Sequence, residues 1–550
     1  MQRSISRLSQ KLYDVAVIGG GIYGAWIARE AAQRGLSVAL VEQGDFGSAT
    51  SSNSQRIAHG GLRYLQHADF RRMRESIQER SILMRVAPHL VFPMPVLIPT
   101  YSNPLEGKTL MAVALKLNDL IGFDRNRDLS AEKHIPAGRI LSKNECLAYC
   151  PGLPQQDLTG AAFFFDGQVH NTERLVLSLL LSAARSGAVL ANYARVIGLL
   201  KNAQAIVGMS IEDVLSGKLV EMRARAFVNC SGPWTDRVVE LAGIVKQRAR
   251  KRWVKAALLL TRQLIPTVAI GVRGNFKYKI ADAFLDKGYR YFFITPWRDG
   301  SLIGTFEVPC NEGPDDFSVT EDEIHSFIGH VNAAYPAGRV TREDVRFVYG
   351  GLVPASDQQG SSGDQPAKCY EICDHASEDG VEGLISIVGV KYTTARRVAE
   401  KAVNLVEARL GKPPVRSQSA IVPIYGGRMR SFAKFLETEL QKKPSGLSEE
   451  TTRHLIQTYG SEYRQVLRYC KEDPAWSKPV SSNSPVIRAQ ILHGVREEMA
   501  CKLEDILFRR TDLGASGCPG DSSVGSCAEI MARDLGLRAG KNRTTEALLA

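Results

Sequence analysis

Three glycines and one acid near the N-terminus have residue types and a spacing that can do chemistry. Gly19, Gly21 and Gly24 form the pattern G-x-G-x-x-G, and Glu42 lies 23 positions after Gly19. The first glycine of such a pattern permits a tight turn, the second lets a pyrophosphate approach the backbone, and the third lets a helix pack closely on a strand. Glu42 could accept hydrogen bonds from ribose hydroxyls. These four residues predict a dinucleotide site if the right elements surround them.

The elements expected around the glycines form a β-α-β unit. Residues 15–18 are a short apolar run between turn residues, which is typical of a strand buried on both faces. Residues 22–32 can present an apolar surface on a helix that Gly35 ends, and its N-terminus would offer free N–H groups to an anion. A second strand over 37–41 leads to Glu42. With all parts in order, dinucleotide binding is predicted over the alternative, a plain crossover whose glycines only make a turn.

Hydroxyl and glycine residues continue the pattern beyond the acid. Thr50, Ser51 and Ser52 belong to a loop of small polar side chains, which can wrap a diphosphate or the edge of a flat isoalloxazine ring. The segment HGGLRY from His59 to Tyr64 follows, and its two glycines permit close approach to such a ring. On composition alone, an ordinary surface loop is the alternative for this segment.

These segments resemble the flavin-dependent glycerol-3-phosphate dehydrogenase family, which belongs to the D-amino-acid-oxidase-like flavoproteins. The resemblance rests on the hydroxyl loop, on HGGLRYL and on QERSILMRVAPHLVFPMP. It implies FAD rather than NAD, bound non-covalently, with residues 59–61 beside the flavin ring. It also implies that Arg63 and Tyr64 face the substrate, where an arginine can hold a phosphate through charge-assisted contacts.

Later segments carry the same resemblance. AFVNCSGPW over 226–234 is similar to the family's strand and turn against the FAD diphosphate, and the strand reaching Val196 is expected at the adenine. GVKYTTAR over 389–396 resembles the start of a helix under the flavin, whose N-terminal amides would stabilise negative charge on the reduced ring. RYFFITPW over 290–297 and the C-terminal stretch REEMA to LEDILFRRT are also similar. The implied FAD contacts are Gly19, Gly21, Gly24, Glu42, Gln43, Thr50, Ser51, Ser52, His59, Gly60, Gly61, Val196, Ser231, Gly232, Gly389, Lys391, Tyr392, Thr393 and Thr394.

The resemblance also implies a set of substrate and catalytic residues. Oxidising an alcohol with a flavin requires the protein to orient the C–H bond, accept the hydroxyl proton and stabilise charge. A phosphorylated substrate adds the need for an anion clamp. The residues carried over to this chain are Arg63, Tyr64, Lys391, Arg290 and Lys368.

Three positions depart from the family's substrate site. The family's K-G-S-H segment is KAAL here, so a candidate base is replaced by Leu258. Its G-V-R-P turn is GLVP, with Val353 where an arginine is expected, and its R-D-Y segment is aligned with KCY, with Lys368 at the arginine. A lysine keeps the charge but loses the bidentate fork. Valine removes the charge, which would weaken a buried phosphate contact by about 2 kcal/mol or more.

These departures leave three functions open. The first is oxidation of glycerol 3-phosphate, with electrons passed from the flavin to quinone or another acceptor, molecular oxygen included. The second is a flavin oxidase or dehydrogenase of the same fold acting on a different alcohol, hydroxy acid or amine. The third is a flavin-binding protein without turnover. The FAD motifs are intact, so all three functions include binding of FAD.

The predicted fold class is α/β, in three parts. A Rossmann-type FAD-binding domain is expected over 1–100, 160–250 and 355–412, and an inserted antiparallel β-sheet substrate domain over 101–159 and 251–354. A C-terminal helical domain is expected over 425–550. A chain of 550 residues is long enough for several domains.

One predicted helix is strongly basic. Residues 69–86 have a helical pattern and carry five arginines, namely Arg71, Arg72, Arg74, Arg80 and Arg85. We interpret this helix as having a solvated charged face, with contact to a membrane surface as the alternative.

Composition limits the class of partner. The net charge of +12 favours anionic partners, which include phosphorylated substrates and anionic membranes, and we find no nucleic-acid motif. The ten cysteines include two C-x3-C pairs without further ligands at zinc spacing, so reduced thiols and no metal site are expected. No apolar run is long enough to span a bilayer. We expect a cytoplasmic protein, with peripheral attachment to the inner face of the membrane and a homodimer left open.

Overall fold

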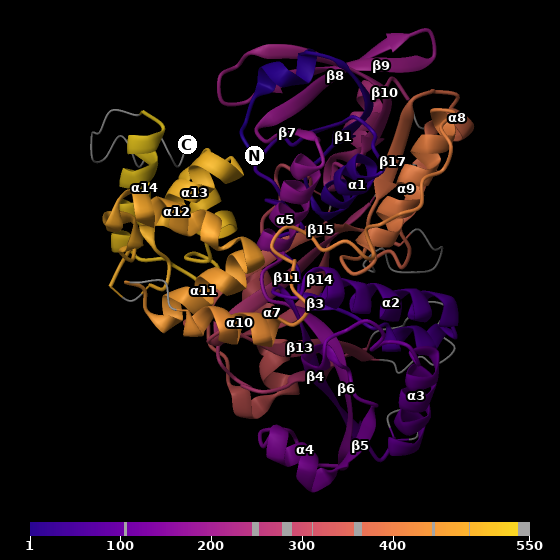
Figure 1. Cartoon of the computed structure of the whole chain (residues 1–550). Helices are drawn as coiled ribbons and strands as arrows, with labels where there is room; N and C mark the ends of the chain where they lie inside the picture. Colours follow the sequence, from indigo (N-terminus) through magenta and orange to yellow (C-terminus); the bar gives the residue numbers. More distant parts are fainter. Residues whose placement is uncertain are drawn as a thin grey trace.

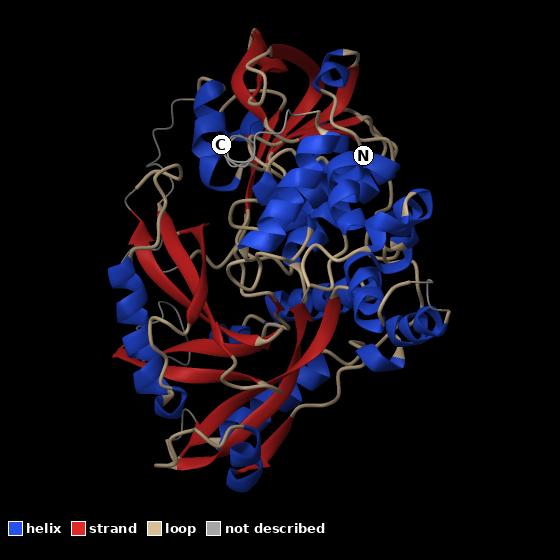
Figure 2. Cartoon of the chain, turned by 90° about the vertical axis from the view of Figure 1, so that its left-hand side faces the viewer, coloured by secondary structure: helices blue, strands red, loops and turns tan. Residues whose placement is uncertain are grey.

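The structure is a computed structural model in which a mostly parallel sheet and a mostly antiparallel sheet are joined to a group of C-terminal helices (Figure 1). It describes residues 1–103, 107–244, 252–277, 289–310, 312–356, 366–442, 446–482 and 484–536. Of residues 275–277, 289 and 290 it describes the backbone only. Figure 2 shows the two sheets as separate groups of strands, with helices in front of and between them.

The first sheet is built around β1 (Leu12–Ile18). Within the described residues its strand order is β16-β17-β10-β1-β2-β7, and β8 and β9 form a hairpin that continues from β10. β1 pairs in parallel with β2 and with β10, and its four last residues are buried, which is typical of a parallel strand. The remaining strands of this sheet are β2 (Val38–Val41), β7 (Val189–Ala191), β8 (Ala194–Asn202), β9 (Ala205–Asp213), β10 (Leu219–Asn229), β16 (Glu371–Asp374) and β17 (Leu384–Val388).

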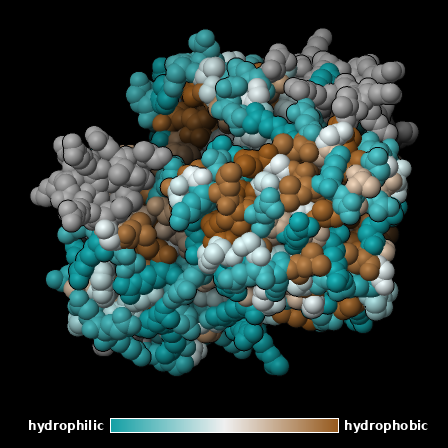
Figure 3. Space-filling model, turned by 90° about the horizontal axis from the view of Figure 1, so that it is seen from above, coloured by the Kyte–Doolittle hydropathy of each residue, from teal (hydrophilic) through white to brown (hydrophobic). Residues whose placement is uncertain are grey.

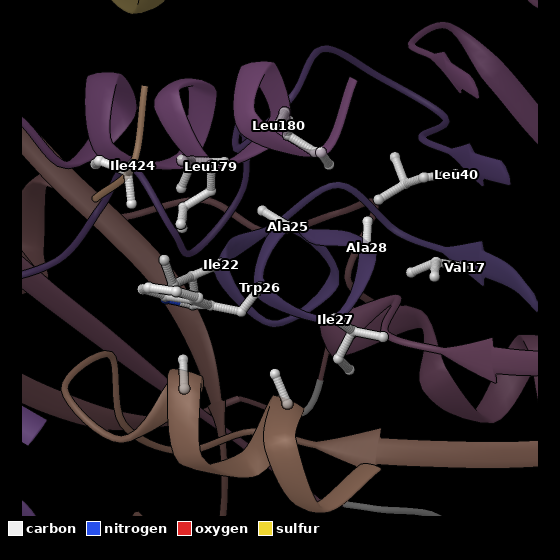
Figure 4. Packing of buried hydrophobic residues seen from close by; sticks show 14 of the residues in the cluster. Val17, Ile22, Ala25, Trp26, Ile27, Ala28, Leu40, Leu179, Leu180 and Ile424 are labelled. Carbon is white, nitrogen blue, oxygen red and sulfur yellow. The ribbon is translucent and has the colours of Figure 1, made fainter. Parts of the chain in front are cut away.

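Helix α1 (Ile22–Gln33) is the buried centre of this part. It packs between α5 (Thr172–Arg185) and α9 (Ala395–Arg409). Figure 4 shows Leu179 and Leu180 of α5 on one side of α1, with Trp26 and Ile27 directed toward the other. The small residues between these large side chains let three helices and the sheet approach closely, which fixes the start of α1 relative to β1.

The second sheet has the order β15-β11-β14-β13-β12-β4-β6-β3, with β5 on β6. Its pairs are antiparallel except β4 with β12. Helices α3 and α4 contact β6, and α7 contacts β12. The strands are β3 (Ile57–Ala58), β4 (Val91–Tyr101), β5 (Arg139–Ser142), β6 (Leu158–Val169), β11 (Trp253–Arg262), β12 (Ala269–Lys277), β13 (Tyr289–Trp297), β14 (Gly300–Cys310) and β15 (Val345–Pro354). The helices that flank or join the two sheets are α2 (Phe70–Val86), α3 (Lys108–Ile121), α4 (Lys143–Tyr149), α6 (Thr235–Leu241), α7 (Glu321–Ala334) and α8 (His375–Glu378).

The two sheets divide the chain differently from the expected boundaries. Residues 1–100 and 160–250 were expected to belong to the FAD-binding part alone. Their strands β3, β4 and β6 instead pair in the second sheet. The chain therefore crosses between sheets more often than hydrophobic patterns indicate, because a strand's pattern does not name its partner. The division into domains stays a prediction.

The C-terminal region is helical where it is described. Its core joins apolar residues of separate helices, among them Leu455 and Leu492, and Ile506 and Met531. Its helices are α10 (Phe432–Gln441), α11 (Glu449–Tyr459), α12 (Arg464–Glu472), α13 (Arg488–Glu498) and α14 (Asp521–Asp534), with a π-helical turn over Asp505–Arg510. Residues 537–550 lie outside the described part.

The prediction of a solvated charged face on α2 holds for the exposed Arg71 but not for the other four arginines. Arg80 is 1% exposed and donates to the Asp166 carboxylate at 2.9 Å. Arg74 forms two hydrogen bonds with Asp124, and Arg85 donates to a backbone carbonyl. Arg74, Arg80 and Arg85 thus pair with segments that pack on α2, and the sequence of the helix alone does not show which segments these are.

Candidate active site

A cavity of about 770 Å³ opens at the carboxyl ends of the parallel strands. Residues that follow four strands line it, namely Gly19 after β1, Glu42 after β2, Ser231 after β10 and Gly389 after β17. Ligands of open α/β sheets bind at this edge, because loops and helix N-termini meet there. A volume of this size is within the range of cofactor and small-molecule sites.

The glycines at the start of α1 leave the backbone bare toward the cavity. Gly19 has a φ of +106°, and a Cβ there would lie 2.5 Å from the Cys230 carbonyl oxygen. A Cβ on Gly24 would lie 1.9 Å from the Gly19 carbonyl oxygen, so Gly24 permits the contact of helix and strand that its spacing predicted. Gly21 is the N-cap of α1, and the Ser51 hydroxyl accepts a hydrogen bond from the Ile22 N–H at 3.0 Å.

Glu42 closes the far side of the same turn. Its carboxylate accepts hydrogen bonds from the Gly20 N–H at 2.6 Å and from the Gly44 N–H at 2.9 Å. Burial raises the pKa of Glu42, and these two amides oppose the shift. Each oxygen of the carboxylate keeps a further lone pair, and Glu42 lines the cavity. The carboxylate is thus held in place to accept hydroxyl groups of a ligand.

The opposite wall is organised by a buried asparagine. Asn229 accepts the Ser231 N–H at 3.2 Å and the Ser231 hydroxyl at 2.6 Å, while its amide donates to the Ser386 hydroxyl at 3.2 Å. His375 contacts Ser386 at 2.8 Å from the other side. These bonds fix the turn that presents Ser231 and Gly232 to the cavity.

Most of the predicted FAD contacts meet at this cavity. Those that line it are Gly19, Gly21, Glu42, Gln43, Thr50, Ser51, Val196, Ser231, Gly232, Gly389, Lys391 and Tyr392. The others lie outside its lining: Gly24 is beneath the turn, the Ser52 hydroxyl donates to the Gly47 carbonyl, and Thr394 is the N-cap of α9. Direct contact of each residue with FAD stays a prediction.

Residues 59–61 lie next to the cavity on a rigid support. The His59 N–H donates to Thr393 Oγ1 at 3.2 Å, and the His59 Nδ1 is 3.1 Å from the Asp166 carboxylate. The same carboxylate accepts the Gly60 N–H at 2.6 Å. Burial raises the Asp166 pKa, but the contacts with His59, Arg80 and Gly60 outweigh burial and leave the pKa below its usual range. A Cβ on Gly60 would lie 2.2 Å from the Arg80 guanidinium, so a larger residue there would displace Arg80 from its pair with Asp166.

A group of cations lies around the ring of Tyr64. The Lys391 ammonium contacts the Tyr64 hydroxyl and lies 4.1 Å from the centre of its ring. The Arg72 guanidinium lies 5.3 Å from the same ring. Burial and the nearby charges of Arg72 and Arg63 lower the pKa of Lys391 to about 8. Lys391 also lines the cavity, so this group borders the cofactor space.

The other predicted substrate residues are placed as follows. The backbone carbonyl of Lys368 lies 3.4 Å from Arg72 Nη1, beside the cation group. The side chain of Arg290 lies outside the described residues, although its backbone belongs to β13. Val353 lines the cavity, whereas Leu258 is 1% exposed and packs in an apolar cluster with Tyr349.

Two contributors to the site carry no clear signal in the sequence. Tyr23 lies on α1, and its hydroxyl donates to the Lys391 carbonyl at 2.7 Å and accepts the Lys391 N–H at 3.1 Å. Its ring fills the space where a Cβ of Gly389 would lie, at 2.0 Å. Arg72 was expected on a solvated face. Both residues become recognisable only when segments more than 290 positions apart come together.

Two family models match the chain. Residues 14–396 match FAD dependent oxidoreductase, and residues 417–542 match the C-terminal domain of alpha-glycerophosphate oxidase. The chain belongs to the FAD-dependent oxidoreductase family. The protein is therefore a flavoprotein enzyme with FAD as its cofactor, and the predicted cofactor and fold class are confirmed.

Relatives of this oxidoreductase are similar over nearly the whole chain. A glycerol-3-phosphate dehydrogenase of Synechocystis sp. is 35% identical over 519 residues, which cover 92% of this chain and 90% of the relative. The mitochondrial glycerol-3-phosphate dehydrogenase of Homo sapiens is 30% identical over 542 residues, which cover 95% of this chain and 70% of the relative. The structure of the Bacillus halodurans glycerol-3-phosphate dehydrogenase complexed with FAD has a TM-score of 0.75 at 25% identity, covering 99% and 95% of the two chains.

The cavity of this oxidoreductase fits FAD. The bare backbone at Gly21 and the N-terminus of α1 suit a diphosphate, which carries negative charge. Glu42 suits ribose hydroxyls, and Val196 lines the wall beyond it. Gly19 cannot be replaced by a larger residue without a clash, because a Cβ there would lie 2.5 Å from the Cys230 carbonyl oxygen.

Proposed function

We propose that this oxidoreductase oxidises glycerol 3-phosphate to dihydroxyacetone phosphate and passes the electrons to a quinone. The observation that carries this proposal is the group of cations around Tyr64, made by Arg63, Arg72 and Lys391, of which Lys391 lines the FAD cavity. A phosphorylated alcohol is a small anion of the kind that such a group would hold. Relatives at 30–35% identity are glycerol-3-phosphate dehydrogenases, which supports the same substrate.

The reaction needs a proton acceptor, and Lys391 has suitable properties. When bound, FAD accepts a hydride from the substrate carbon. The substrate hydroxyl must lose its proton, and a base is most efficient when its pKa is near the working pH. The pKa of Lys391 is lowered to about 8, so a substantial fraction of this amine is neutral at pH 7.5 to 8. The Tyr64 hydroxyl contacts the amine and orients it.

With this role, Lys391 supplies the base that the family pattern leads us to expect at position 258. The histidine that the resemblance places at Leu258 is absent, and Leu258 is buried in an apolar cluster rather than on the cavity wall. We therefore assign the proton-accepting role to Lys391 and the anion-holding role to the arginines. The backbone carbonyl of Lys368 lies at the edge of this group.

Anaerobic flavin reduction tests the proposed function. The FAD-loaded enzyme is mixed with glycerol 3-phosphate, and bleaching of the flavin absorbance is followed with time. We expect bleaching by glycerol 3-phosphate and weaker bleaching by glycerol. Bleaching by another alcohol, hydroxy acid or amine in place of glycerol 3-phosphate would favour the second function, and a flavin reduced by no such compound would favour a protein without turnover.

A peripheral membrane contact is proposed together with the quinone acceptor. Four large apolar side chains are exposed along α3 and just after it, namely Val113 at 51%, Leu117 at 36%, Leu120 at 71% and Phe123 at 78%. Their spacing places them on one side of the helix. The lysines of α3 and the net charge of +12 suit an anionic bilayer surface. Within the described residues, no helix is long and apolar enough to cross a membrane.

Vesicle sedimentation tests this contact. The double variant Leu120→Glu with Phe123→Glu should lose binding to phosphatidylglycerol vesicles and slow reduction of a vesicle-embedded quinone, while reduction of a water-soluble dye stays unchanged. The matched control is Leu219→Glu, which is 68% exposed on β10. β10 extends toward the end of the molecule that Figure 3 views, where apolar areas are separated by polar ones. Equal loss of binding in the control would contradict a specific role for α3. A cytoplasmic location, on the inner face of the membrane, and a homodimer stay predictions.

A further inference from the structure

Arg72 is held in an unusual position at the start of α2. Asp69 caps this helix by accepting the Arg72 N–H at 2.9 Å, and the same carboxylate forms an ion pair with the Arg72 guanidinium. The guanidinium then lies over the Tyr64 ring at 5.3 Å. A backbone hydrogen bond and a side-chain ion pair to one carboxylate fix the arginine, so little conformational entropy remains to be lost on binding a ligand.

The remaining protein contacts of this guanidinium are weak. Nη1 points toward the Cys369 sulfur at 3.1 Å and toward the Lys368 carbonyl at 3.4 Å. A thiol is a poor acceptor, and the carbonyl contact is at the long end of hydrogen bonds. The Arg72 side chain is 28% exposed, so a ligand can reach it. A phosphate oxygen would therefore be a better hydrogen-bond acceptor for the Arg72 guanidinium than the Cys369 sulfur or the Lys368 carbonyl.

Among the described residues that act on the charge of Lys391, two arginines outnumber one carboxylate. Arg72, Arg63 and Lys391 lie close enough that both arginines lower the pKa of Lys391. Asp69 is the carboxylate in contact with Arg72, and it offsets one of the three positive charges. Like charges in a partly buried place repel each other, and an anion with two negative charges would relieve that repulsion.

Arg72 does not line the cavity, but it lies at the ring of Tyr64 together with Lys391, which does. The arginine expected at Val353 is absent, and the valine side chain leaves that part of the cavity wall uncharged. We propose that Arg72, delivered by α2, binds the phosphate of the substrate in place of that arginine and selects phosphorylated over uncharged alcohols. This inference rests on the proposed function, because it names the residue that recognises the phosphate.

The test compares Arg72→Leu with Arg71→Leu in the FAD-loaded enzyme. Arg71 is the neighbouring arginine on α2 and is exposed, so its replacement makes the same change of charge and composition. For Arg72→Leu we expect KM for glycerol 3-phosphate to rise at least tenfold. The accompanying change in kcat/KM for glycerol should be far smaller at pH 9.5, where the Lys391 amine is mostly neutral with or without Arg72. Arg71→Leu should leave both substrates within twofold. Equal losses for the two substrates, or for the two variants, would overturn the proposal.

A second measurement separates recognition of phosphate from a structural role. Removing the Arg72 charge should raise the pKa of Lys391, because Arg72 is one of the charges that lower it. The pH at which flavin reduction by glycerol rises should therefore move upward in Arg72→Leu and stay in place in Arg71→Leu. Adding Val353→Arg to Arg72→Leu should restore at least part of the affinity for glycerol 3-phosphate. An unmoved pH profile together with no recovery would overturn the proposal.

Calorimetry distinguishes failure of this inference from failure of the proposed function. Inorganic phosphate is titrated into the FAD-loaded wild type and into both arginine variants. Loss of phosphate binding in Arg72→Leu alone supports the anion site, even if glycerol 3-phosphate does not reduce the wild-type flavin and the proposed function fails. Unchanged phosphate binding in Arg72→Leu would overturn the role of Arg72, even if glycerol 3-phosphate proves to be the substrate.

Discussion

Replacing Arg510 by methionine should weaken FAD binding, although Arg510 does not line the cavity. Arg510 belongs to the C-terminal region and donates two hydrogen bonds of 2.7 Å to the Asp45 carboxylate. Both side chains are buried, at 1% and 0% exposure. Asp45 follows Glu42, Gln43 and Gly44, which line the cavity. The C-terminal helices therefore hold the loop that presents Glu42.

The expected magnitude follows from the contacts that are lost. Removing one partner of a buried ion pair costs about 3–5 kcal/mol, because the other charge stays buried without compensation. Asp45 keeps a hydrogen bond of 2.6 Å from Arg509 and one of 3.0 Å from Asn192, which places the cost near the lower end, about 3 kcal/mol. Less than half of this free energy, about 1.4 kcal/mol, is enough to weaken FAD binding tenfold.

The assay titrates apoprotein with FAD and follows the quenching of flavin fluorescence. We expect the dissociation constant for FAD to rise at least tenfold in Arg510→Met. The control is Arg468→Met, which removes an exposed ion pair to Glu497 in the same helical region, and such pairs contribute about 0–1 kcal/mol. A double variant with Asp45→Asn should recover part of the stability to urea, because it no longer leaves a buried carboxylate unpaired.

Two outcomes would refute this reasoning. One is an unchanged dissociation constant for FAD in Arg510→Met with a clear loss of stability to urea, which would mean that the loop keeps its position without the clamp. The other is an equal effect of Arg468→Met, which would mean that any damage to the helical region loosens the cofactor. In either case the buried pair would stabilise the fold without positioning Glu42.

Three further predictions concern the cavity and its edge. Gly24→Ala should lower FAD retention at least a hundredfold, because its Cβ would lie 1.9 Å from the Gly19 carbonyl oxygen; flavin absorbance of the purified protein measures this, and normal retention would contradict it. Lys391→Ala should lower flavin reduction far more than FAD retention, and equal loss of both would make Lys391 a cofactor or folding residue. The rate of flavin reduction in the wild type should rise with pH through about 8, because burial and nearby arginines lower the pKa of Lys391 to that value and the neutral amine accepts the proton; stopped-flow rates between pH 6 and 9.5 that stay flat would exclude this role.

Local sequence patterns were sufficient for the cofactor half of the molecule. The apolar run at β1, the glycines that follow it and the acid after β2 lie within 42 residues, and each acts through the backbone or its nearest neighbours. Gly19 adopts a positive φ, and Gly24 has no room for a Cβ. The G-x-G-x-x-G spacing already predicts a tight turn at the first position and close packing of helix and strand at the third. The dinucleotide cradle could therefore be predicted before any tertiary contact was known.

The group of cations around Tyr64 was decided by tertiary structure. Arg72 and Lys391 are more than 300 positions apart and meet around Tyr64, and Arg510 reaches Asp45 over 465 positions. A periodic pattern states which face of a helix is apolar, but it does not state which loop will cover a charged face. For that reason the charged face of α2 was predicted to be solvated, while the structure pairs four of its five arginines with carboxylates. Local periodicity follows from backbone geometry, whereas the convergence of charges depends on how every element packs.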